Sequence, residues 1–315
     1  MVIEERTITL SNGVKMPMVG LGTWLTSPAE AKVAVKVAIE AGYRLIDTAA
    51  AYDNEGAIGE TIKELIQAGK INRGELFITT KVGSTLICGN LMEFHWRTTS
   101  LQLWVSHLHP DDVEDALRES LGRLQMDYVD LYLAHAPTCF NHDVTAQNPS
   151  VKVQDTWRGL ESVYKKGLTK AIGVSNYNCE QIERVLRKAT VPIHNCQVEL
   201  HLYWPQYELH DVCKRKLVWP EAPNDLDDSN VKVLATKYTK TPAQILLRYL
   251  IDRNIAVLPK SVNPLRIVEN FQVFDFALTM DDIRLLESAG HHKRLFMADF
   301  MEGHPEDPFA AERKH

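Results

Sequence analysis

The 315-residue sequence lacks the features that mark secreted, membrane-spanning and nucleic-acid-binding proteins. No apolar run approaches the ~18 residues of a membrane span, and the first residues, MVIEERTITL, lack the apolar core of a signal peptide. The sequence has no basic cluster and its net charge is −6, so neither nucleic acid nor an anionic membrane is expected as a partner. We therefore expect a cytoplasmic protein that acts on a small molecule.

Cysteine is also scarce. The chain has five cysteines, and no two of them form a CxxC pair. An odd number at this spacing argues against both a disulfide framework and a zinc ribbon, so we expect reduced, mostly buried thiols and no metal site. The five are Cys88, Cys139, Cys179, Cys196 and Cys213.

Two segments near the N-terminus show clear local signals. TITLSNGVKMP (7–17) predicts a β-hairpin, because Asn12-Gly13 is a dipeptide favoured in tight primed turns. The next helical stretch is expected to begin after Ser27, with Pro28 in its first turn, and to end at Gly42.

Apolar runs typical of buried parallel strands alternate with helical stretches along the rest of the chain. This alternation predicts an α/β fold with a parallel sheet covered by helices. No Pro-, Gly- or Ser-rich linker interrupts it, so residues 1–315 are expected to form a single domain. The expected strands lie at 18–24, 43–49, 76–82, 128–135, 171–176, 195–201 and 255–261.

An open dinucleotide-binding sheet and a closed barrel both fit this alternation. The open sheet requires G-x-G-x-x-G after its first strand, whereas this sequence has only Gly20 and Gly22 before Thr23 and Trp24. The strands instead share a polar residue near the carboxyl end, as is typical of a (β/α)8 TIM barrel, although only seven of eight strands are found. These residues are Asp47, Lys81, His135, Ser175, Asn176, Gln197, Lys260 and Ser261.

Four of the candidate residues have the chemistry of proton transfer to a carbonyl group. Neighbouring strands lie about 5 Å apart, so Asp47 and Lys81 can pair in the barrel mouth. An ammonium beside the Tyr52 phenol would stabilise the phenolate and make Tyr52 a usable proton donor, while His135 can orient a carbonyl oxygen. Each residue alone is better explained by a structural role, and only the combination of all four favours catalysis.

PKSVNPLRIVEN (259–270) predicts an anion site. Asn263 is expected to cap a helix beginning at Pro264, where free backbone amides would favour an anion. Arg266 and Lys260 beside it fit the 2′-phosphate of NADP better than the bare ribose of NAD. The alternative is a capped helix with solvated charges.

The segments GLGTW, YRLIDTAAAYDNEGAIG, ITTKV, DYVDLYLAHAP, KGLTKAIGVSNYN, CQVELH and LPKSVNPLRIVENFQVFDFAL resemble the aldo-keto reductases, in order and over nearly the whole chain. The resemblance implies a (β/α)8 barrel and an oxidoreductase that reduces aldehydes or ketones to alcohols, by hydride transfer from NADPH bound in extended form, with a tyrosine as general acid. It also leads us to expect a monomer.

The resemblance assigns roles to named residues. It places the catalytic tetrad on Asp47, Tyr52, Lys81 and His135. The nicotinamide carboxamide falls to Ser175, Asn176 and Gln197, and the adenine to Glu269 and Asn270. The complete expected cofactor-binding set is Thr23, Trp24, Asp47, Ser175, Asn176, Gln197, Lys260, Ser261, Val262, Asn263, Arg266, Glu269 and Asn270, and the expected substrate pocket is Trp24, Tyr52, Trp104 and His135.

The chain departs from the family pattern in two places. Residues 83–103 form an insertion directly after the strand that carries Lys81, where they can displace Trp104. Residues 217–230 stand where the family has a seventh strand ending in a tyrosine that stacks on the nicotinamide, so that strand is expected to be truncated or missing, with KLVW as a stub. The four catalytic positions favour a reductase. The lost strand favours the alternative, a catalytically impaired nucleotide-binding or structural isoform of the same barrel.

Overall fold

A computed structural model describes residues 6–82, 106–214, 226–288 and 294–314. The N-terminal hairpin is present as predicted: β1 (Thr7–Thr9) pairs antiparallel with β2 (Lys15–Pro17). Gly13 adopts a φ of +84° in the turn, a left-handed conformation that glycine reaches without steric cost.

Six parallel strands follow in a single sheet, and each pairs with the next along the chain. Parallel neighbours require a crossover between them, which the intervening helices supply. All six strands are buried along their length, so the α/β expectation of a helix-covered parallel sheet is confirmed. The strands are β3 (Gly20–Gly22), β4 (Leu45–Asp47), β5 (Phe77–Val82), β6 (Leu131–Ala134), β7 (Ile172–Ser175) and β8 (Asn195–Gln197).

The predicted strand at 255–261 is only partly realised. It forms two isolated parallel bridges to β3, between Val19 and Val257 and between Gly22 and Lys260. Pro259 has no N–H group, so the ladder is interrupted between the two bridges. The Pro259 carbonyl nonetheless accepts a hydrogen bond from the Gly22 amide at 3.2 Å. The segment therefore lies against β3, on the side away from β4.

The two predicted departures fall largely outside the described residues. This is the case for the insertion at 83–103, for KLVW and for residues 217–225 of the altered region. In the described remainder between β8 and α8 (Ser229–Tyr238), no strand is assigned, and Asp228 caps α8 by accepting from the amides of Asn230 and Val231.

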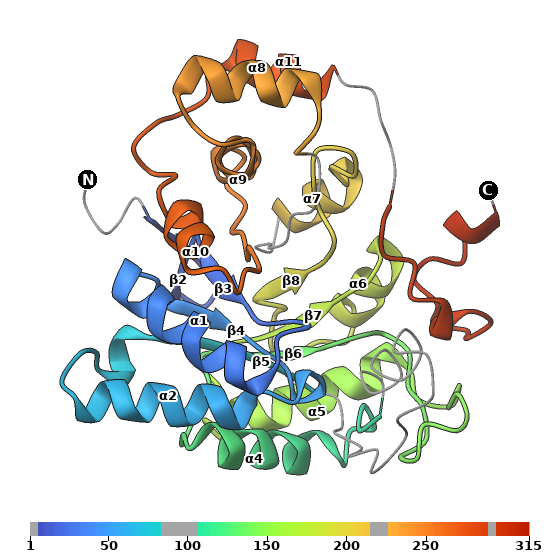
Figure 1. The fold of residues 1–315 in the computed structure, drawn as a ribbon. Coiled ribbons are helices and arrows are strands. Elements are labelled where there is room, and N and C mark those ends of the chain that lie inside the picture. The colour runs from blue at the N-terminus through green and yellow to red at the C-terminus, as the bar shows by residue number, and fades with distance from the viewer. Residues whose placement is uncertain (1–5, 83–105, 215–225, 289–293, 315) are drawn as a thin grey trace, which may run out of the picture.

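The helices that follow the strands cover the outer face of the sheet (Figure 1). The first of them begins and ends as predicted, with Ser27 and Glu30 forming a capping box and Gly42 ending it at a φ of +106°. No helix in the described ranges is long and apolar enough to cross a bilayer. This first helix is α1 (Pro28–Ala41), and besides α8 the others are α2 (Glu55–Gln67), α4 (Val113–Leu124), α5 (Val153–Lys165), α6 (Cys179–Leu186), α7 (Tyr207–Lys214), α9 (Pro242–Asp252), α10 (Pro264–Phe271) and α11 (Met280–Glu287).

His194 makes the stability of this fold depend on pH. Its ring is 1% exposed just before β8, where Nδ1 accepts a hydrogen bond from the Ile172 amide at 3.0 Å. Burial lowers the pKa of His194 to about 4. The unfolded chain therefore binds more protons below pH ~6.5, and stability falls as the pH drops from there towards 4.

We expect His194 to contribute about 2 kcal/mol of the stability lost between pH 7 and pH 4.5. Urea unfolding of His194→Asn, which keeps an acceptor but cannot titrate, should show a correspondingly smaller loss over this interval. His109→Asn, at an exposed position, serves as the control and should keep the pH dependence of the unaltered chain. Identical pH dependence in all three proteins would refute the assignment.

Candidate active site

The four predicted catalytic side chains meet at the carboxyl ends of β4, β5 and β6. Lys81 Nζ donates to Asp47 Oδ1 at 2.6 Å and to the Tyr52 hydroxyl at 3.2 Å. The Tyr52 hydroxyl in turn lies 3.4 Å from His135 Nε2. The sheet register explains the first contact: Asp47 lies opposite Thr79, and Lys81 is two residues further along the same face of β5. The structure therefore brings the whole predicted tetrad into one chain of contacts.

The ion pair at the centre of this cluster is buried and fully hydrogen-bonded. Lys81 and Asp47 are 1% and 2% exposed. The third proton of the ammonium goes to the Thr48 carbonyl at 3.0 Å, and Asp47 Oδ2 accepts from Gln197 Nε2 at 2.8 Å. An ammonium has three donors, so Lys81 has no freedom to turn elsewhere. The pair is held in one geometry, pointing a positive charge at the Tyr52 hydroxyl.

His135 is neutral at ordinary pH. Burial lowers its pKa well below the usual value, and the nearby Lys81 ammonium lowers it further. The ring therefore acts as a hydrogen-bonding imidazole and not as an imidazolium acid. With His135 excluded as the acid, the Tyr52 phenol is the candidate proton donor of this cluster.

Asn54, which is not among the predicted site residues, holds the loop that carries Tyr52. The side chain is 1% exposed and uses both sides of its amide. Its Oδ1 accepts from Thr48 Oγ1 at 2.8 Å, and its Nδ2 donates to the carbonyls of Thr23 at 2.9 Å and Thr26 at 3.1 Å. These bonds tie the Tyr52 loop to the loop after β3. The available signal was a polar residue in a largely buried stretch only two positions after Tyr52.

The predicted substrate residue Trp24 is partly covered by the C-terminal segment. Its ring meets Phe296 edge-on at a centroid distance of 6.3 Å. Glu199 fixes that segment by accepting from the amides of Leu295 at 2.6 Å and Phe296 at 2.9 Å. These hydrogen bonds could not be predicted from the sequence, because no local pattern links positions nearly a hundred residues apart. Trp104 lies outside the described residues.

Ser175, Asn176 and Gln197 lie together at the ends of β7 and β8, where Ser175 pairs in register with Gln197. Asn176 Nδ2 donates to the His135 carbonyl at 3.0 Å, and Gln197 Nε2 is held by Asp47. In the described part of the chain, the two side-chain amide oxygens and the Ser175 proton have no partner in the protein. Two acceptors and one donor complement the NH₂ and C=O of a carboxamide, so these residues fit the predicted nicotinamide group.

Thr23 supports Asp47 from the neighbouring strand. Its amide and its hydroxyl both donate to the Asp47 carbonyl, at 3.1 and 2.9 Å. The hydroxyl proton of Thr23 is thus used within the protein, and the residue fixes the backbone under the Asp47 carboxylate.

The second predicted group, residues 260–270, lies at the start of α10, and the bridge from Lys260 to Gly22 connects it to the central cluster. Asn263 caps the helix as predicted, with its Oδ1 accepting from the amides of Leu265 and Arg266 at 2.9 and 3.3 Å. Pro264 has no N–H group. In this structure the cap occupies both amides, so the predicted anion site stays a prediction, and an anion here would depend on the side chains.

The side chains of this group remain available. Arg266 and Lys260 are exposed, and within the described ranges neither forms an ion pair. Ser261 Oγ accepts from the Asn263 amide at 3.1 Å, and Glu269 Oε1 accepts from Thr241 at 2.7 Å. Val262 is half-buried and Asn270 is buried. Recognition of a phosphate at this place would rest on Arg266 and Lys260.

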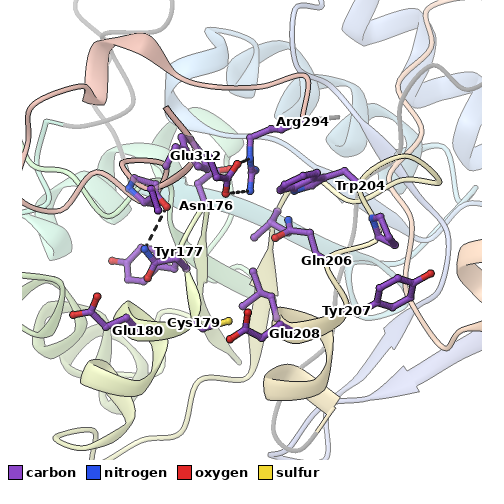
Figure 2. A pocket seen from close by; sticks show the side chains of 17 residues that line it. Asn176, Tyr177, Cys179, Glu180, Trp204, Gln206, Tyr207, Glu208, Arg294 and Glu312 are labelled. Carbon is purple, nitrogen blue, oxygen red and sulfur yellow. Dashed lines mark hydrogen bonds and ion pairs between the residues drawn. The ribbon is translucent and has the colours of Figure 1, made fainter. Parts of the chain in front are cut away.

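A cavity of about 550 Å³ adjoins the site but is not its mouth (Figure 2). It lies between the segments after β7 and β8 and the C-terminal segment, and Asn176 is the one predicted site residue among its lining. Arg294 pairs with Glu312 along one side, and its guanidinium lies 4.7 Å from the Trp204 ring centroid. Among the described residues, no group of His, Cys, Asp and Glu side chains could hold a metal ion.

Comparison with known proteins matches most of the chain to one family. The model of the Aldo/keto reductase family matches residues 18–218 and 222–291. The protein named Aldo-keto reductase family 1 member A1 is 40% identical in Gallus gallus, over 96% of this chain and 97% of that protein. The Xenopus tropicalis protein of the same name is 41% identical, over 88% of this chain and 86% of its own.

Solved structures agree with this match. The aldose reductase from Schistosoma japonicum superposes with a TM-score of 0.88 at 35% identity, over 97% of this chain and 99% of its own. A Bombyx mori aldo-keto reductase, AKR2E4, solved in complex with NADP, gives a TM-score of 0.84 at 34% identity, over 96% and 98% of the two chains.

Proposed function

Because the chain belongs to the aldo/keto reductase family, we propose that Tyr52, Lys81, Asp47 and His135 are its catalytic residues. The protein is an NADP-dependent oxidoreductase that reduces aldehydes and ketones to alcohols. The observation that carries the proposal is the bridging position of Lys81 Nζ, 2.6 Å from Asp47 Oδ1 and 3.2 Å from the Tyr52 hydroxyl. This arrangement supports catalysis over the alternative of an impaired isoform.

Each residue has a separate task in this proposal. Bound NADPH supplies the hydride. Tyr52 donates its proton to the carbonyl oxygen, and the Lys81 ammonium stabilises the phenolate that remains. Asp47 holds Lys81 in place, and the neutral His135 donates a hydrogen bond that orients the substrate oxygen. Trp24 forms one wall of the substrate pocket, with Phe296 beside it.

The cofactor-binding assignment rests on hydrogen-bond donors and acceptors of the site that have no partner among the described residues. The two amide oxygens of Asn176 and Gln197 and the Ser175 hydroxyl are proposed to hold the carboxamide of the nicotinamide. At the other end, Arg266 and Lys260 are proposed to bind the 2′-phosphate, with Glu269 and Asn270 near the adenine. The bridge between Gly22 and Lys260 places Gly22 and Thr23 beside the second group. An extended cofactor that joins the two groups is therefore proposed to pass these two residues.

Two measurements on the purified chain test this function. NADPH should quench the tryptophan fluorescence, and a simple aromatic aldehyde should then cause NADPH to be oxidised with formation of the alcohol. Quenching without oxidation of any aldehyde or ketone tested would favour the alternative, a nucleotide-binding isoform that does not catalyse the reaction.

Arg266→Ala should weaken NADPH binding by about 10- to 150-fold and leave NADH binding nearly unchanged. The loss corresponds to a charge-assisted contact of about 1.5–3 kcal/mol, and only NADPH carries the 2′-phosphate. Because Asn263 occupies the helix amides, they cannot compensate. Fluorescence titration with both cofactors measures the ratio, with the exposed Arg187→Ala as a control. Equal losses of affinity for NADPH and NADH would show that Arg266 does not bind the 2′-phosphate.

We further propose that the protein acts as a cytoplasmic monomer and that residues 1–315 work as one domain. The free thiols of Cys139, Cys179, Cys196 and Cys213 suit a reducing compartment. Exposed large apolar side chains are spread over several elements, such as Val33 on α1, Val233 on α8 and Met280 on α11, as is ordinary for a monomer. Light scattering after size-exclusion chromatography would measure the mass directly.

A further inference from the structure

A second cavity, of about 600 Å³, lies at the end of the sheet opposite the catalytic cluster. Its lining residues come from the β1–β2 hairpin, from the turns that lead into the strands and from the end of α10. Arg44 immediately precedes β4, and Asp130 immediately precedes β6. Asp47 and His135 stand at the other ends of these two strands. A molecule in this cavity would therefore not touch the proposed catalytic residues.

The lining of this cavity is positively charged, although the chain carries a net charge of −6. Four cations face only two carboxylates, those of Asp130 and Glu75. Asp130 is already neutralised by Arg73 at 2.8 Å and Lys170 at 2.9 Å. Glu75 is held by the Asn72 amide and side chain at 2.8 and 2.9 Å. The four cations are Arg6, Lys15, Arg44 and Lys170.

Two of these cations, Arg6 and Arg44, form no ion pair with a carboxylate in the described part of the chain. The hydrogen bonds from Asn72 and, less strongly, the charge of Arg44 lower the pKa of Glu75, so Arg44 lies near this carboxylate without bonding to it. The Arg6 guanidinium lies 4.9 Å from the centroid of the Phe274 ring, and its buried Nε has no acceptor there. Arg44 Nη1 donates hydrogen bonds to the carbonyls of Tyr43 at 2.8 Å and Ile39 at 3.3 Å. A guanidinium has five donors in a planar fork that matches a carboxylate or phosphate. Both arginines therefore retain donors that an anion would satisfy.

Most of the remaining lining is apolar. It includes Phe271 and Phe274 at and after the end of α10, Leu76 and Phe77 at the start of β5, and Val14 and Val19 near the hairpin. The volume falls in the range of small-molecule sites, which are mostly apolar with a few placed polar groups. A bare inorganic anion would leave these apolar walls uncovered. The combination selects a molecule with an anionic head and a flat apolar body.

We propose that this cavity binds a small aromatic carboxylate, with the carboxylate between Arg6 and Arg44 and the ring against Phe271 and Phe274. The Arg6 guanidinium already packs on the phenyl faces, which fixes the fork and lowers the entropy cost of ordering it. The site depends on none of the proposed catalytic residues, so it stands or falls independently of the proposed function.

Calorimetric titration of the full chain with 1-naphthoate tests the proposal. Arg6→Gln and Arg44→Gln should each weaken binding at least tenfold, and the exposed control Arg187→Gln by less than twofold. The neutral isostere 1-naphthalenemethanol and inorganic phosphate should each bind at least tenfold more weakly than 1-naphthoate. Hydrogen exchange with 1-naphthoate present should slow in residues 6–17 and 271–276.

Three results would overturn the proposal. One is unchanged affinity in both arginine variants. Another is slowed exchange confined to the Tyr52 loop at 47–54 and the C-terminal segment at 294–300, which would place 1-naphthoate in the candidate active site. A third is binding of phosphate or of the alcohol as tight as that of 1-naphthoate, which would show that the cavity does not require both an anionic head and an aromatic body. If one arginine variant does not fold, the other variant and the exchange pattern of the unaltered chain still decide the question.

Discussion

Tyr52→Phe should lower the turnover number for carbonyl reduction by about 10²- to 10⁴-fold, the usual contribution of a positioned general acid. No second acid replaces it in the described site, because His135 is kept neutral by burial and by the Lys81 charge. The substituted ring keeps its place beside His135, so the substrate pocket keeps its shape. Steady-state NADPH oxidation with a saturating aromatic aldehyde measures the loss.

The same variant should bind NADPH within about twofold of the unaltered chain. The phenol belongs to the proton-transfer group, and Lys81 retains Asp47 and Thr48 as partners when the hydroxyl is removed. Tyr164→Phe removes a half-buried phenol on α5 and is the matched control, expected to leave turnover unchanged. Full turnover in Tyr52→Phe would sink the assignment of the proton donor, whereas an equal loss of NADPH binding would show a cofactor-binding role instead.

The location of the catalytic cluster could be predicted from the sequence because it follows from strand polarity. Carboxyl ends of parallel strands lie at one edge of a sheet, so polar residues near those ends converge whatever the loops do. Asp47, Lys81 and His135 obey this rule, and the observed register brings Asp47 and Lys81 onto one face. The extent of the strands was harder to predict. The run at 255–261 has the apolar pattern of a strand, but Pro259 interrupts its ladder and only two bridges form.

Contacts between distant segments could not be predicted. Glu199 accepts from the amides of Leu295 and Phe296, and the choice of those partners depends on the path that the C-terminal segment takes over the ends of the strands. The start of α10 shows a related difficulty. The same Asn263 that marks a helix start in the sequence also consumes the amides that a helix start offers to an anion. A cap and an amide-based anion site are competing interpretations of one pattern, and only the hydrogen bonds decide between them.

Lys81→Met should destabilise the fold by about 3–5 kcal/mol at neutral pH, the usual cost of leaving one partner of a buried ion pair uncompensated. Asp47 is 2% exposed and, among the described residues, would keep only Gln197 as a side-chain donor. A buried carboxylate without its cation is the source of the expected loss.

Urea unfolding at pH 7 measures the size of this effect. Lys36→Met, at an exposed position on α1, is the control and should shift stability by less than about 0.5 kcal/mol. Adding Asp47→Asn to Lys81→Met removes the stranded charge, so the double variant should recover much of the loss. A single variant that loses less than about 1 kcal/mol, or a double variant whose losses simply add, would mean that Lys81 and Asp47 do not compensate each other. The ammonium would then not be held in place at the Tyr52 phenol by Asp47, and Asp47 would have to leave the proposed catalytic group.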